Sequence, residues 1–350
     1  MRRHLNTLYV TTQGAYLNKD CANVVVSIDG AERARVPIHT LGGLVGFGRV
    51  GLSAPLLGYC AEEGVAVTFL SEQGRFLARV EGPVSGNVLL RREQYRRTDD
   101  PHGCAAIVRS LVIGKALNQR AVIRRALRDH GARMEPVASA TLELAERRLT
   151  DIARRAERPV AMAQAADALR GLEGEAANVY FGAFDVLIRA QTEDFRFTGR
   201  SRRPPLDPVN ALLSFVYALL VHDARSALET VGLDPAVGFL HRDRPGRPSL
   251  ALDLIEEFRP FFADRLVLSL INRRQVSVHG FRRMENGACL MTDEARKTVL
   301  VAYQERKREE LRHPYLGEPT TVGLLWHLQA QLLARHLRGD LDGYPPFVWK

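Results

Sequence analysis

Three acidic residues stand close enough in the sequence to share one turn of helix and to do chemistry together. Asp253, Glu256 and Glu257 lie at positions i, i+3 and i+4 of the segment 250–260, and side chains with these spacings are neighbours on an α-helix. Like charges in such pairs repel by roughly 0.2–0.5 kcal/mol each. A divalent cation or a nearby arginine would turn this repulsion into attraction, and the alternative is a solvated acidic face.

A further carboxylate and an imidazole stand far away in the chain. Glu173 lies in a predicted helix between Gly171 and Gly174, and His241 opens an arginine-rich loop. A glycine inside a helix costs roughly 0.5–1 kcal/mol relative to alanine. Two glycines around a carboxylate therefore predict that something approaches the backbone closely there; the alternative is a notch into which another helix packs. A lone histidine in a loop is most often structural or exposed.

These groups together would suit a metal that acts on phosphate esters. Glu173, His241 and one carboxylate of the acidic helix form a carboxylate–imidazole–carboxylate set, which suits Mn²⁺ or Mg²⁺ when coordination positions stay open. On a basic protein such a metal would polarise a phosphodiester and activate an attacking oxygen. The spacing alone does not choose between Glu256 and Glu257 as the third ligand.

The composition favours a globular protein with a polyanionic partner. Hydrophobic residues make up 46% of the 350 residues, and the net charge is +9 with a pI of about 9.7. Only five of the 49 basic residues are lysines, and the planar guanidinium of arginine suits bidentate contacts with phosphate. A basic chain of this kind favours nucleic acid or an anionic membrane surface as its partner.

The cysteines and the apolar runs exclude several classes of protein. No C-x-x-C pair occurs, which excludes a zinc ribbon and predicts four free thiols in a reducing cytoplasm. These thiols are Cys21, Cys60, Cys104 and Cys289. No apolar segment follows the basic residues 1–4, and no run of about 18 apolar residues occurs, so we expect no signal peptide and no membrane span.

Short β-type segments fill roughly the first 90 residues. Asp29-Gly30 between two β-branched runs is a strong hairpin signal, and Ser53 is a suitable N-cap with Pro55 in the first helical turn. We therefore predict a β-rich domain with one helix. Its elements are Leu8–Thr11, Asn23–Ile28, Glu32–Pro37, the helix Ser53–Glu63, and the strands Val65–Leu70 and Arg75–Glu81 around a turn at Ser71–Gly74.

One motif in this domain matches the dinucleotide-binding pattern G-x-G-x-x-G. It covers residues 46–51, and Glu72 follows at about the spacing of the ribose-binding carboxylate. The strands before it are predicted as a hairpin and not as the start of a βαβ unit, and no alternating strands and helices follow. We therefore favour a glycine-rich bend.

The composition changes near residues 91–102, and the chain beyond is predicted to be overwhelmingly helical. This change predicts an α+β fold with a β-rich domain at 1–95 and an all-α domain at 96–350. The predicted helices are 104–131, 137–157, 161–190, 207–231, 249–271, 291–312 and 319–338. Pro260 should kink or end its helix. The arginine-rich segments 191–208 and 241–248 are predicted either as solvated loops or as grips for a nucleic-acid backbone.

Four motifs in a fixed order resemble the CRISPR-associated integrase family, whose members insert new spacers into CRISPR arrays. The motifs are Leu172-Glu173-Gly174-x-Ala176-Ala177-x-x-Tyr180-Phe181, Asp207-Pro208-Val209-Asn210-Ala211-Leu212-Leu213-Ser214, Gly238-Phe239-Leu240-His241, and Ser249-Leu250-x-x-Asp253-Leu254-x-Glu256-x-Phe258-Arg259-Pro260. The segments 5–11 and 86–91 resemble the branch found in type I-C systems.

The resemblance implies a site and a reaction. It implies that Glu173, His241 and Glu256 are the catalytic metal ligands for Mg²⁺ or Mn²⁺, with Asp253 as a further acidic position. The implied reaction is attack of the 3′-hydroxyl of a captured spacer duplex on the leader–repeat junction. The arginines closest in sequence to these ligands are expected to contact DNA, namely Arg242, Arg244, Arg247 and Arg259.

The resemblance also implies an architecture and partners. It implies a β-sandwich-like N-terminal domain that mediates dimerisation and an all-helical catalytic domain. The expected partners are double-stranded DNA and a small CRISPR-associated protein dimer, which joins the homodimers in a heterohexamer in the cytoplasm. The alternatives are a stand-alone metal-dependent nuclease for branched or repair DNA and a non-catalytic nucleic-acid-binding scaffold.

Overall fold

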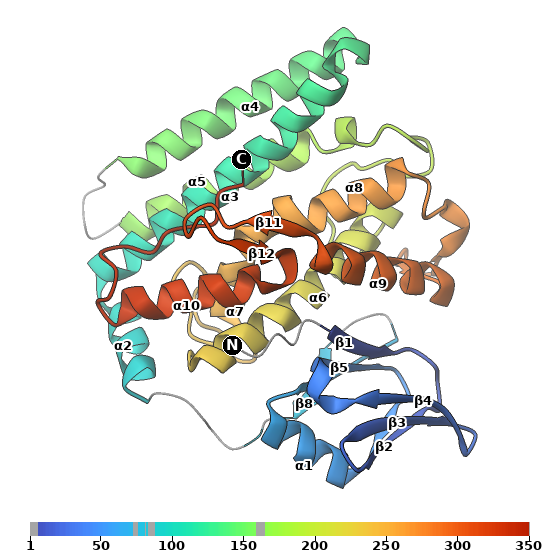
Figure 1. Ribbon diagram of the computed structural model, residues 1–350. Helices are drawn as coiled ribbons and strands as arrows, with labels where there is room; N and C mark the ends of the chain where they lie inside the picture. Colours follow the sequence, from blue (N-terminus) through green and yellow to red (C-terminus); the bar gives the residue numbers. More distant parts are fainter. Residues whose placement is uncertain (1–5, 73–75, 81, 83–87, 159–164, 350) are drawn as a thin grey trace.

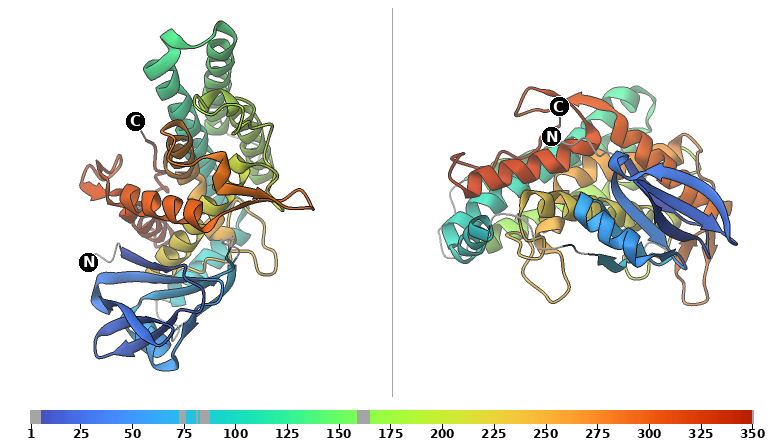
Figure 2. Two further views of the ribbon diagram at one scale, coloured as in Figure 1. Left: turned by 90° about the vertical axis from the view of Figure 1, so that its right-hand side faces the viewer. Right: turned by 60° about the horizontal axis from the view of Figure 1, so that its bottom comes forward.

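The β-rich part of the chain and the helical part form two neighbouring regions of the molecule. The structure is a computed structural model and describes residues 6–72, 76–80, 82, 88–158 and 165–349. The β-rich region lies at one end of the molecule and the helices form the larger body (Figures 1 and 2). The α+β fold class is therefore confirmed. Some predicted positions lie outside the described residues, among them 1–5, 73–75, 81, 86–87 and 161–164.

The described residues of the N-terminal region form two four-stranded sheets and one helix. The first sheet has the order β1-β5-β7-β8, with β1 Asn6–Val10, β5 Leu41–Phe47, β7 Ala66–Leu70 and β8 Phe76–Val80. The second has the order β4-β3-β2-β6, with β4 Ala31–Pro37, β3 Asn23–Ile28, β2 Tyr16–Asp20 and β6 Gly51–Leu52. Apolar side chains from both sheets and from α1, Ala54–Glu63, form one core cluster.

The predicted hairpin is confirmed. Strands β3 and β4 pair antiparallel, and Asp29 and Gly30 between them have φ of 51° and 78°. Two positive φ values are the requirement of a type I′ turn, which matches the right-handed twist of the strands that it joins. Ser53 also caps α1 as predicted, since its hydroxyl accepts a hydrogen bond from Leu56 N at 3.3 Å.

The expectation that no βαβ arrangement occurs here is wrong. Strands β5 and β7 are parallel neighbours and α1 connects them. Strand β5 was not predicted, because the prediction relied on β-branched residues and β5 is rich in glycine. Since these glycines lack side chains, neighbouring residues can approach the strand closely. A Cβ on Gly46 would lie 3.2 Å from Val50 Cβ.

The G-x-G-x-x-G segment nevertheless forms a bend whose amides are used inside the protein. Gly48 has φ of +70° and donates its N–H to Leu70 O at 2.8 Å, and Gly51 donates to Ala15 O at 2.9 Å. A Cβ on Gly51 would come within 2.8 Å of the Tyr16 ring. These glycines therefore allow close approach between neighbouring segments of the β-rich region, as the bend interpretation requires.

The helical region is built around the 30-residue helix α3. This helix packs against α4, α5 and α7, and Figure 1 shows it running through the upper part of the helical body. The helices are α2 Val88–Asp99, α3 Pro101–His130, α4 Pro136–Glu157, α5 Ala165–Gly182, α6 Pro208–Val231, α7 Ser249–Glu256, α8 Arg265–Asn272, α9 Asp293–Arg308 and α10 Leu325–Leu337.

Two small hairpins and one break depart from the all-helical prediction. Strands β9 Phe281–Arg283 and β10 Cys289–Met291 form one pair, and β11 Glu310–Arg312 and β12 Pro319–Thr321 form the other. The predicted helix 249–271 is divided into α7 and α8 by a π-helical turn at Arg259–Asp264. Pro260 stands in this turn, so the predicted break at proline is confirmed.

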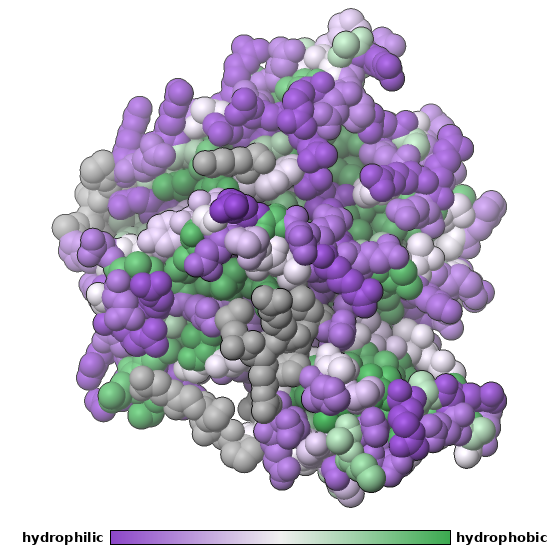
Figure 3. All heavy atoms as spheres, viewed as in Figure 1, coloured by the Kyte–Doolittle hydropathy of each residue, from purple (hydrophilic) through white to green (hydrophobic). Residues whose placement is uncertain are grey.

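Helix α6 is the core helix of this region. It is long and apolar enough to cross a membrane by length and composition, but 61% of its apolar window is buried inside the protein. It packs against α7, α10 and the π-helical turn. The visible surface in Figure 3 is mostly hydrophilic, with smaller apolar patches between. Burial by other helices therefore accounts for the apolar character of α6.

Helix α2 belongs structurally with the helices and lies across residue 95. Gln94 is fully buried and donates to Asp234 O and Val237 O, both at 2.8 Å, while its own oxygen accepts from Asp234 N at 2.9 Å. These bonds hold α2 to the loop that leads to His241. The division of the chain into two domains stays a prediction, and we propose to place it before Val88 and not at residue 95.

Replacing Gln94 by alanine is expected to lower the free energy of unfolding by at least about 3 kcal/mol. The substitution leaves two carbonyl groups and one amide without partners, and each unsatisfied buried group costs about 1–3 kcal/mol. Urea denaturation measures this change. The control is Glu93→Ala, because the pairs of Glu93 with Arg96 and Arg97 are partly exposed and should contribute less than about 1 kcal/mol. Equal losses in the two variants would contradict the anchoring role of Gln94.

Candidate active site

The loop that carries His241 is wrapped around one buried carboxylate. Asp253 is fully buried in α7, and its oxygens accept the backbone N–H groups of Phe239 at 2.6 Å, Leu240 at 3.0 Å and His241 at 2.9 Å. A Cβ on Gly238 would lie 2.8 Å from Asp253 Oδ2. The Gly-Phe-Leu-His motif therefore needs its glycine so that the loop can approach α7 this closely.

The same carboxylate orients the imidazole. His241 Nδ1 lies 2.7 Å from Asp253 Oδ1, and on the other side of the ring Nε2 lies 4.0 Å from Glu256 Oε1. A carboxylate bound at one ring nitrogen fixes the tautomer and leaves the other nitrogen as a lone-pair donor. Asp253 is therefore an orienting group, and the Nε2 atom of His241 is the one that faces the site.

Helix α5 supports this loop from the other side. Arg170 donates its Nε to Leu240 O at 2.7 Å and an Nη2 hydrogen to Phe239 O at 2.9 Å. Arg170 stands one helical turn before Glu173, so the helix that presents this glutamate also holds the histidine loop. Hydrogen bonds from α5 therefore act together with those to Asp253 of α7 to set the position of His241 relative to Glu173.

Glu173 and Glu256 meet at one ammonium group. Lys115, in the middle of α3, is only 4% exposed; its Nζ contacts Glu173 Oε1 and lies 2.7 Å from Glu256 Oε2. Arg259 Nη1 approaches the other oxygen of Glu256 at 2.5 Å. Helices α3, α5 and α7 therefore converge on one cluster of opposite charges.

The charges of this cluster stabilise one another. Burial by itself would raise the pKa of Glu256, but Arg259 and Lys115 outweigh it and lower that pKa below its usual range. Burial would likewise lower the pKa of Lys115, and the carboxylates of Glu256 and Glu173 raise it instead. The glutamate is therefore ionised and the lysine protonated at neutral pH.

The alternative interpretation of these three residues, a solvated acidic face, is wrong. Asp253, Glu256 and Glu257 are all between 0% and 1% exposed, because each points to a different partner. Asp253 binds the histidine loop and Glu256 faces Lys115. Glu257 accepts Phe347 N and the Tyr344 hydroxyl, both at 2.7 Å, and Gln329 Nε2 at 3.0 Å.

The geometry separates Glu256 from Glu257. Glu257 is turned towards the C-terminal segment 344–349. Asn118 of α3 donates hydrogen bonds from its Nδ2 to the backbone carbonyl oxygens of Glu257 and Phe347, at 2.7 and 2.8 Å. Burial raises the pKa of Glu257 to about 8. Glu256 lies towards His241 and Lys115, whereas its neighbour anchors the end of the chain.

The packing-notch interpretation of the glycines around Glu173 is also wrong. Apart from the two chain neighbours and the backbone of α5 itself, no heavy atom of the described residues lies within 4 Å of a Cβ built on Gly171 or Gly174. The side chain of Glu173 is 26% exposed, more than that of any other member of the charge cluster. This part of α5 is therefore open next to the glutamate.

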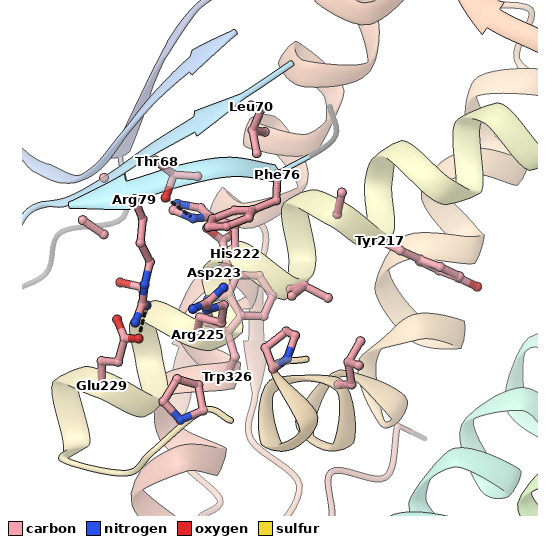
Figure 4. Close-up of a pocket in the computed structure, with 18 of the residues that line it drawn as sticks. Thr68, Leu70, Phe76, Arg79, Tyr217, His222, Asp223, Arg225, Glu229 and Trp326 are labelled. Carbon is pink, nitrogen blue, oxygen red and sulfur yellow. Dashed lines mark hydrogen bonds and ion pairs between the residues drawn. The ribbon is translucent and has the colours of Figure 1, made fainter. Parts of the chain in front are cut away.

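A large cleft reaches the site from the β-rich region. Its volume is about 1960 Å³, and His241 is the one residue of the predicted ligand set among its lining residues. Strands β7 and β8 form one wall and α6 the other, where Thr68 Oγ1 lies 2.9 Å from His222 Nδ1 and Arg79 pairs with Glu229 (Figure 4). The arginines that line the cleft are Arg79, Arg91, Arg200, Arg202, Arg203, Arg225, Arg244, Arg247 and Arg259.

The four arginines expected to contact DNA have different surroundings. Arg244 and Arg247 line the cleft beside His241. Arg242 is 70% exposed and pairs with Asp167 at 2.7 Å. Arg259 is engaged with Glu256 and stacks on the Tyr217 ring at 4.8 Å. Of the four, Arg244 and Arg247 are thus the best placed for phosphate, and the DNA contacts stay a prediction.

Two residues of the site were absent from the predicted set. Lys115 had a signal in the sequence, since it is one of five lysines in an arginine-rich chain and falls on the apolar side of its helix, one turn after Leu111. Arg170 had no such signal, because an arginine on a helix surface is common. Only the fold brings Arg170 under the histidine loop.

Comparison with known proteins places the chain in one family. The model of the CRISPR-associated protein Cas1 family matches residues 8–305. A CRISPR-associated endonuclease Cas1 of Rhodospirillum rubrum is 59% identical over 350 residues, which cover 100% of both chains. Another, from Chlorobaculum tepidum, is 57% identical over 350 residues with the same coverage.

Solved structures share the fold at lower identity. A Cas1 protein from Thermotoga maritima has a TM-score of 0.80 at 22% identity, with 99% of this chain and 100% of that chain covered. A casposase bound to its integration product has a TM-score of 0.81 at 22% identity, with coverages of 99% and 94%. The predicted family resemblance is confirmed: the chain belongs to the Cas1 family of CRISPR-associated proteins.

Proposed function

We propose that this protein is a metal-dependent DNA integrase and endonuclease of CRISPR adaptation. The observation that carries the proposal is the convergence of Glu173, Glu256 and His241, from three separate parts of the chain, beside an arginine-lined cleft. The names of full-length relatives, which are CRISPR-associated endonucleases, support it. The reaction is a transesterification: the 3′-hydroxyl of a captured duplex attacks a phosphodiester at the leader–repeat junction, a new phosphorus–oxygen bond forms, and the bond to the 3′-oxygen of the target strand breaks and leaves a free 3′-hydroxyl.

The donor set fits Mg²⁺ or Mn²⁺, although a lysine stands among the donors. In the described part of the chain no group of three His, Cys, Asp or Glu side chains could hold a metal ion as it stands. Yet two carboxylates already share one cation, and Asp253 leaves Nε2 of the nearby His241 as a donor. Glu173, His241 and Glu256 would hold the metal, which would supply Lewis-acid stabilisation of charge on the phosphoryl oxygens.

The protein's own residues position the reactants around this centre. Asp253 and Arg170 keep the histidine loop in place, and Arg259 holds Glu256 ionised. Arginines such as Arg244 and Arg247 neutralise backbone phosphates and orient the DNA, since phosphate contacts set register and not sequence. Holding the attacking hydroxyl in line with the phosphorus lowers the entropic part of the barrier.

The proposed partners follow from the family. They are double-stranded DNA, a second copy of the chain in a homodimer, and a small CRISPR-associated protein dimer that completes a heterohexamer in the cytoplasm. One solved complex of similar fold joins a Cas1 part to Cas2, with a TM-score of 0.78 at 22% identity. The assignment to the type I-C branch remains part of this proposal.

A stand-alone nuclease for branched or repair DNA is the second candidate, because hydrolysis and strand transfer use one site and differ in the attacking oxygen. A pre-cut duplex and a supercoiled plasmid with a CRISPR repeat distinguish the two. An integrase joins the duplex to the plasmid, whereas a nuclease only cuts. A non-catalytic scaffold would bind DNA without either reaction.

Replacing Glu173 by alanine is expected to abolish metal-dependent strand transfer. The substitution removes a proposed ligand that is partly exposed, so the fold and basal DNA binding should change little. Gel assays of duplex joining measure the activity, and circular dichroism with a DNA-binding titration checks the fold. Native activity in a folded Glu173→Ala protein would show that the site is assigned wrongly.

Glu256→Gln and Glu257→Gln are expected to differ sharply. Losing a proposed ligand at Glu256 should lower strand transfer by more than the roughly 10–100-fold that loss of an outer-shell partner costs. At Glu257 a neutral amide replaces a carboxyl whose pKa burial raises to about 8, so activity at pH 7 should stay close to native. Equal losses in the two variants would mean that the wrong neighbour was chosen.

The pH dependence of stability gives an independent check on Glu257. Its pKa in the folded protein is about 8, above the unfolded value of about 4.3, so the stabilising contribution is complete below pH 4.3 or so. It is lost as the pH rises through about 8. Melting temperatures across this range should fall less steeply in Glu257→Gln than in the native protein. Identical pH profiles would contradict the buried neutral carboxyl.

DNA binding is expected to weaken steeply with salt. Each phosphate that an arginine neutralises should contribute about −0.9 to the slope of log K against log salt. Fluorescence anisotropy of a labelled duplex between about 50 and 200 mM salt measures the slope. The matched comparison is Arg244→Gln, which should make the slope shallower by about 0.9, the contribution of one phosphate contact. A flat response in the native protein would argue against a nucleic-acid role.

A further inference from the structure

One lysine occupies the position where a cation is expected. Lys115 projects from the middle of α3 with 4% of its surface exposed, and its Nζ contacts a carboxylate oxygen of Glu173 on α5 and one of Glu256 on α7. A lysine ammonium is a compact point charge, whereas the guanidinium of arginine is a planar fork. The chain has 44 arginines and only five lysines. The residue between the two glutamates is nevertheless a lysine, whose compact charge resembles that of a metal ion more closely than a guanidinium does.

We infer that Lys115 is the built-in counter-ion of Glu173 and Glu256, and that a divalent cation must displace it to enter the site. This inference rests on the proposed metal site. Without metal, two carboxylates beside one another need a positive charge, because leaving a buried charge unpaired is strongly destabilising. With metal, the same oxygens bind the cation, and the ammonium is repelled from it.

Arg259, the other cation beside Glu256, is expected to keep its position when a metal binds. Arg259 takes Oε1 of Glu256 and stacks on Tyr217 at 4.8 Å, while Lys115 faces Oε2. Lys115 Nζ lies 2.7 Å from Oε2 and also contacts Glu173, so this ammonium is shared between two carboxylates. Arg259 thus keeps Glu256 ionised in either state, whereas Lys115 bridges the two glutamates and competes for both.

The consequence is that Lys115 sets the metal affinity. Metal binding must break the two ion pairs of Lys115, so the net affinity is lower than the donors alone would give. The glutamates are in return held close together before the metal arrives, and the metal-free protein is stabilised. Removing the ammonium should therefore tighten metal binding and weaken the metal-free fold.

The test is Lys115→Met in the full-length protein, with melting temperature followed in EDTA and across a titration with MnCl₂. In EDTA the variant is expected to melt below the native protein, and at saturating Mn²⁺ the difference should shrink. Half-saturation should occur at an Mn²⁺ concentration lower by about tenfold or more, where tenfold corresponds to about 1.4 kcal/mol. Because ligand binding to the native state raises its stability, both effects appear in one data set.

The matched control is Lys307→Met. Lys307 is also 4% exposed and pairs with a buried carboxylate, Asp223, at 2.9 Å. Its loss should lower the melting temperature equally with and without Mn²⁺ and leave the half-saturating concentration unchanged. A Lys307 variant that also binds Mn²⁺ more tightly would overturn the inference, because the effect would then follow general destabilisation.

A second measurement uses the native chain and does not depend on the folding of a variant. Acetylation of Lys115 by acetic anhydride, followed by peptide mass spectrometry, should be slow in EDTA and faster in Mn²⁺, with Lys307 as the internal reference. An unchanged or slower reaction of Lys115 in Mn²⁺ would contradict displacement.

Glu173→Gln separates failure of this inference from failure of the proposed function. If native and Glu173→Gln proteins respond identically to Mn²⁺, the proposed metal site is wrong and the role of Lys115 falls with it. If the native response depends on Glu173 but Lys115→Met binds Mn²⁺ equally or more weakly, the metal site stands and only the displacement by metal is refuted.

Discussion

The burial of charge at the junction of three helices is the constraint that organises this protein. Glu256 is 1% exposed and Lys115 4%; the two charges are paired with each other, and Arg259 is a further partner of Glu256. The desolvation cost of such groups is several kcal/mol per ion even in real proteins. Helices α3, α5 and α7 must therefore pack so that their charged groups meet within ion-pair distance, and the surrounding loops take their positions from that junction.

The acidic helix shows how one short segment can serve three purposes. Successive residues turn by about 100° around a helix, so the adjacent Glu256 and Glu257 point in different directions, and Asp253 lies one turn earlier, beside the histidine loop. Asp253 binds the histidine loop, Glu256 enters the charge cluster, and Glu257 receives the C-terminal segment. The π-helical turn that begins at Arg259 follows directly, and such turns occur often at functional sites.

The site and the cleft together explain why this arrangement suits phosphodiester chemistry. The centre holds two carboxylates, an oriented imidazole and a cation, and the cleft supplies an excess of arginine. The chain belongs to the Cas1 family, as the match over residues 8–305 and relatives of full length show, and DNA is the substrate that we propose. The proposed difference between integration and cutting then depends on which oxygen attacks, which is decided by what the cleft holds and not by the centre itself.

The sequence by itself determined much of the helical structure, one hairpin and the order of the motifs. Helix periodicity predicted α3, α4 and α6 closely, the Asp29-Gly30 signal predicted the hairpin, and the motifs identified the family before any coordinates. These features depend on neighbouring residues, whose spacing the sequence contains. The boundary between domains, the ligand roles and the partners remain predictions.

Only the tertiary structure decided how distant residues meet. The parallel pairing of β5 with β7, the separate directions of Glu256 and Glu257, and the arrival of Lys115 between two glutamates all depend on contacts between residues far apart in the chain. Lys115 lies 58 positions from Glu173, and no periodic pattern links them. Charge compensation in a buried site is a property of packed surfaces, so it appears only when the helices that carry the charges are in place.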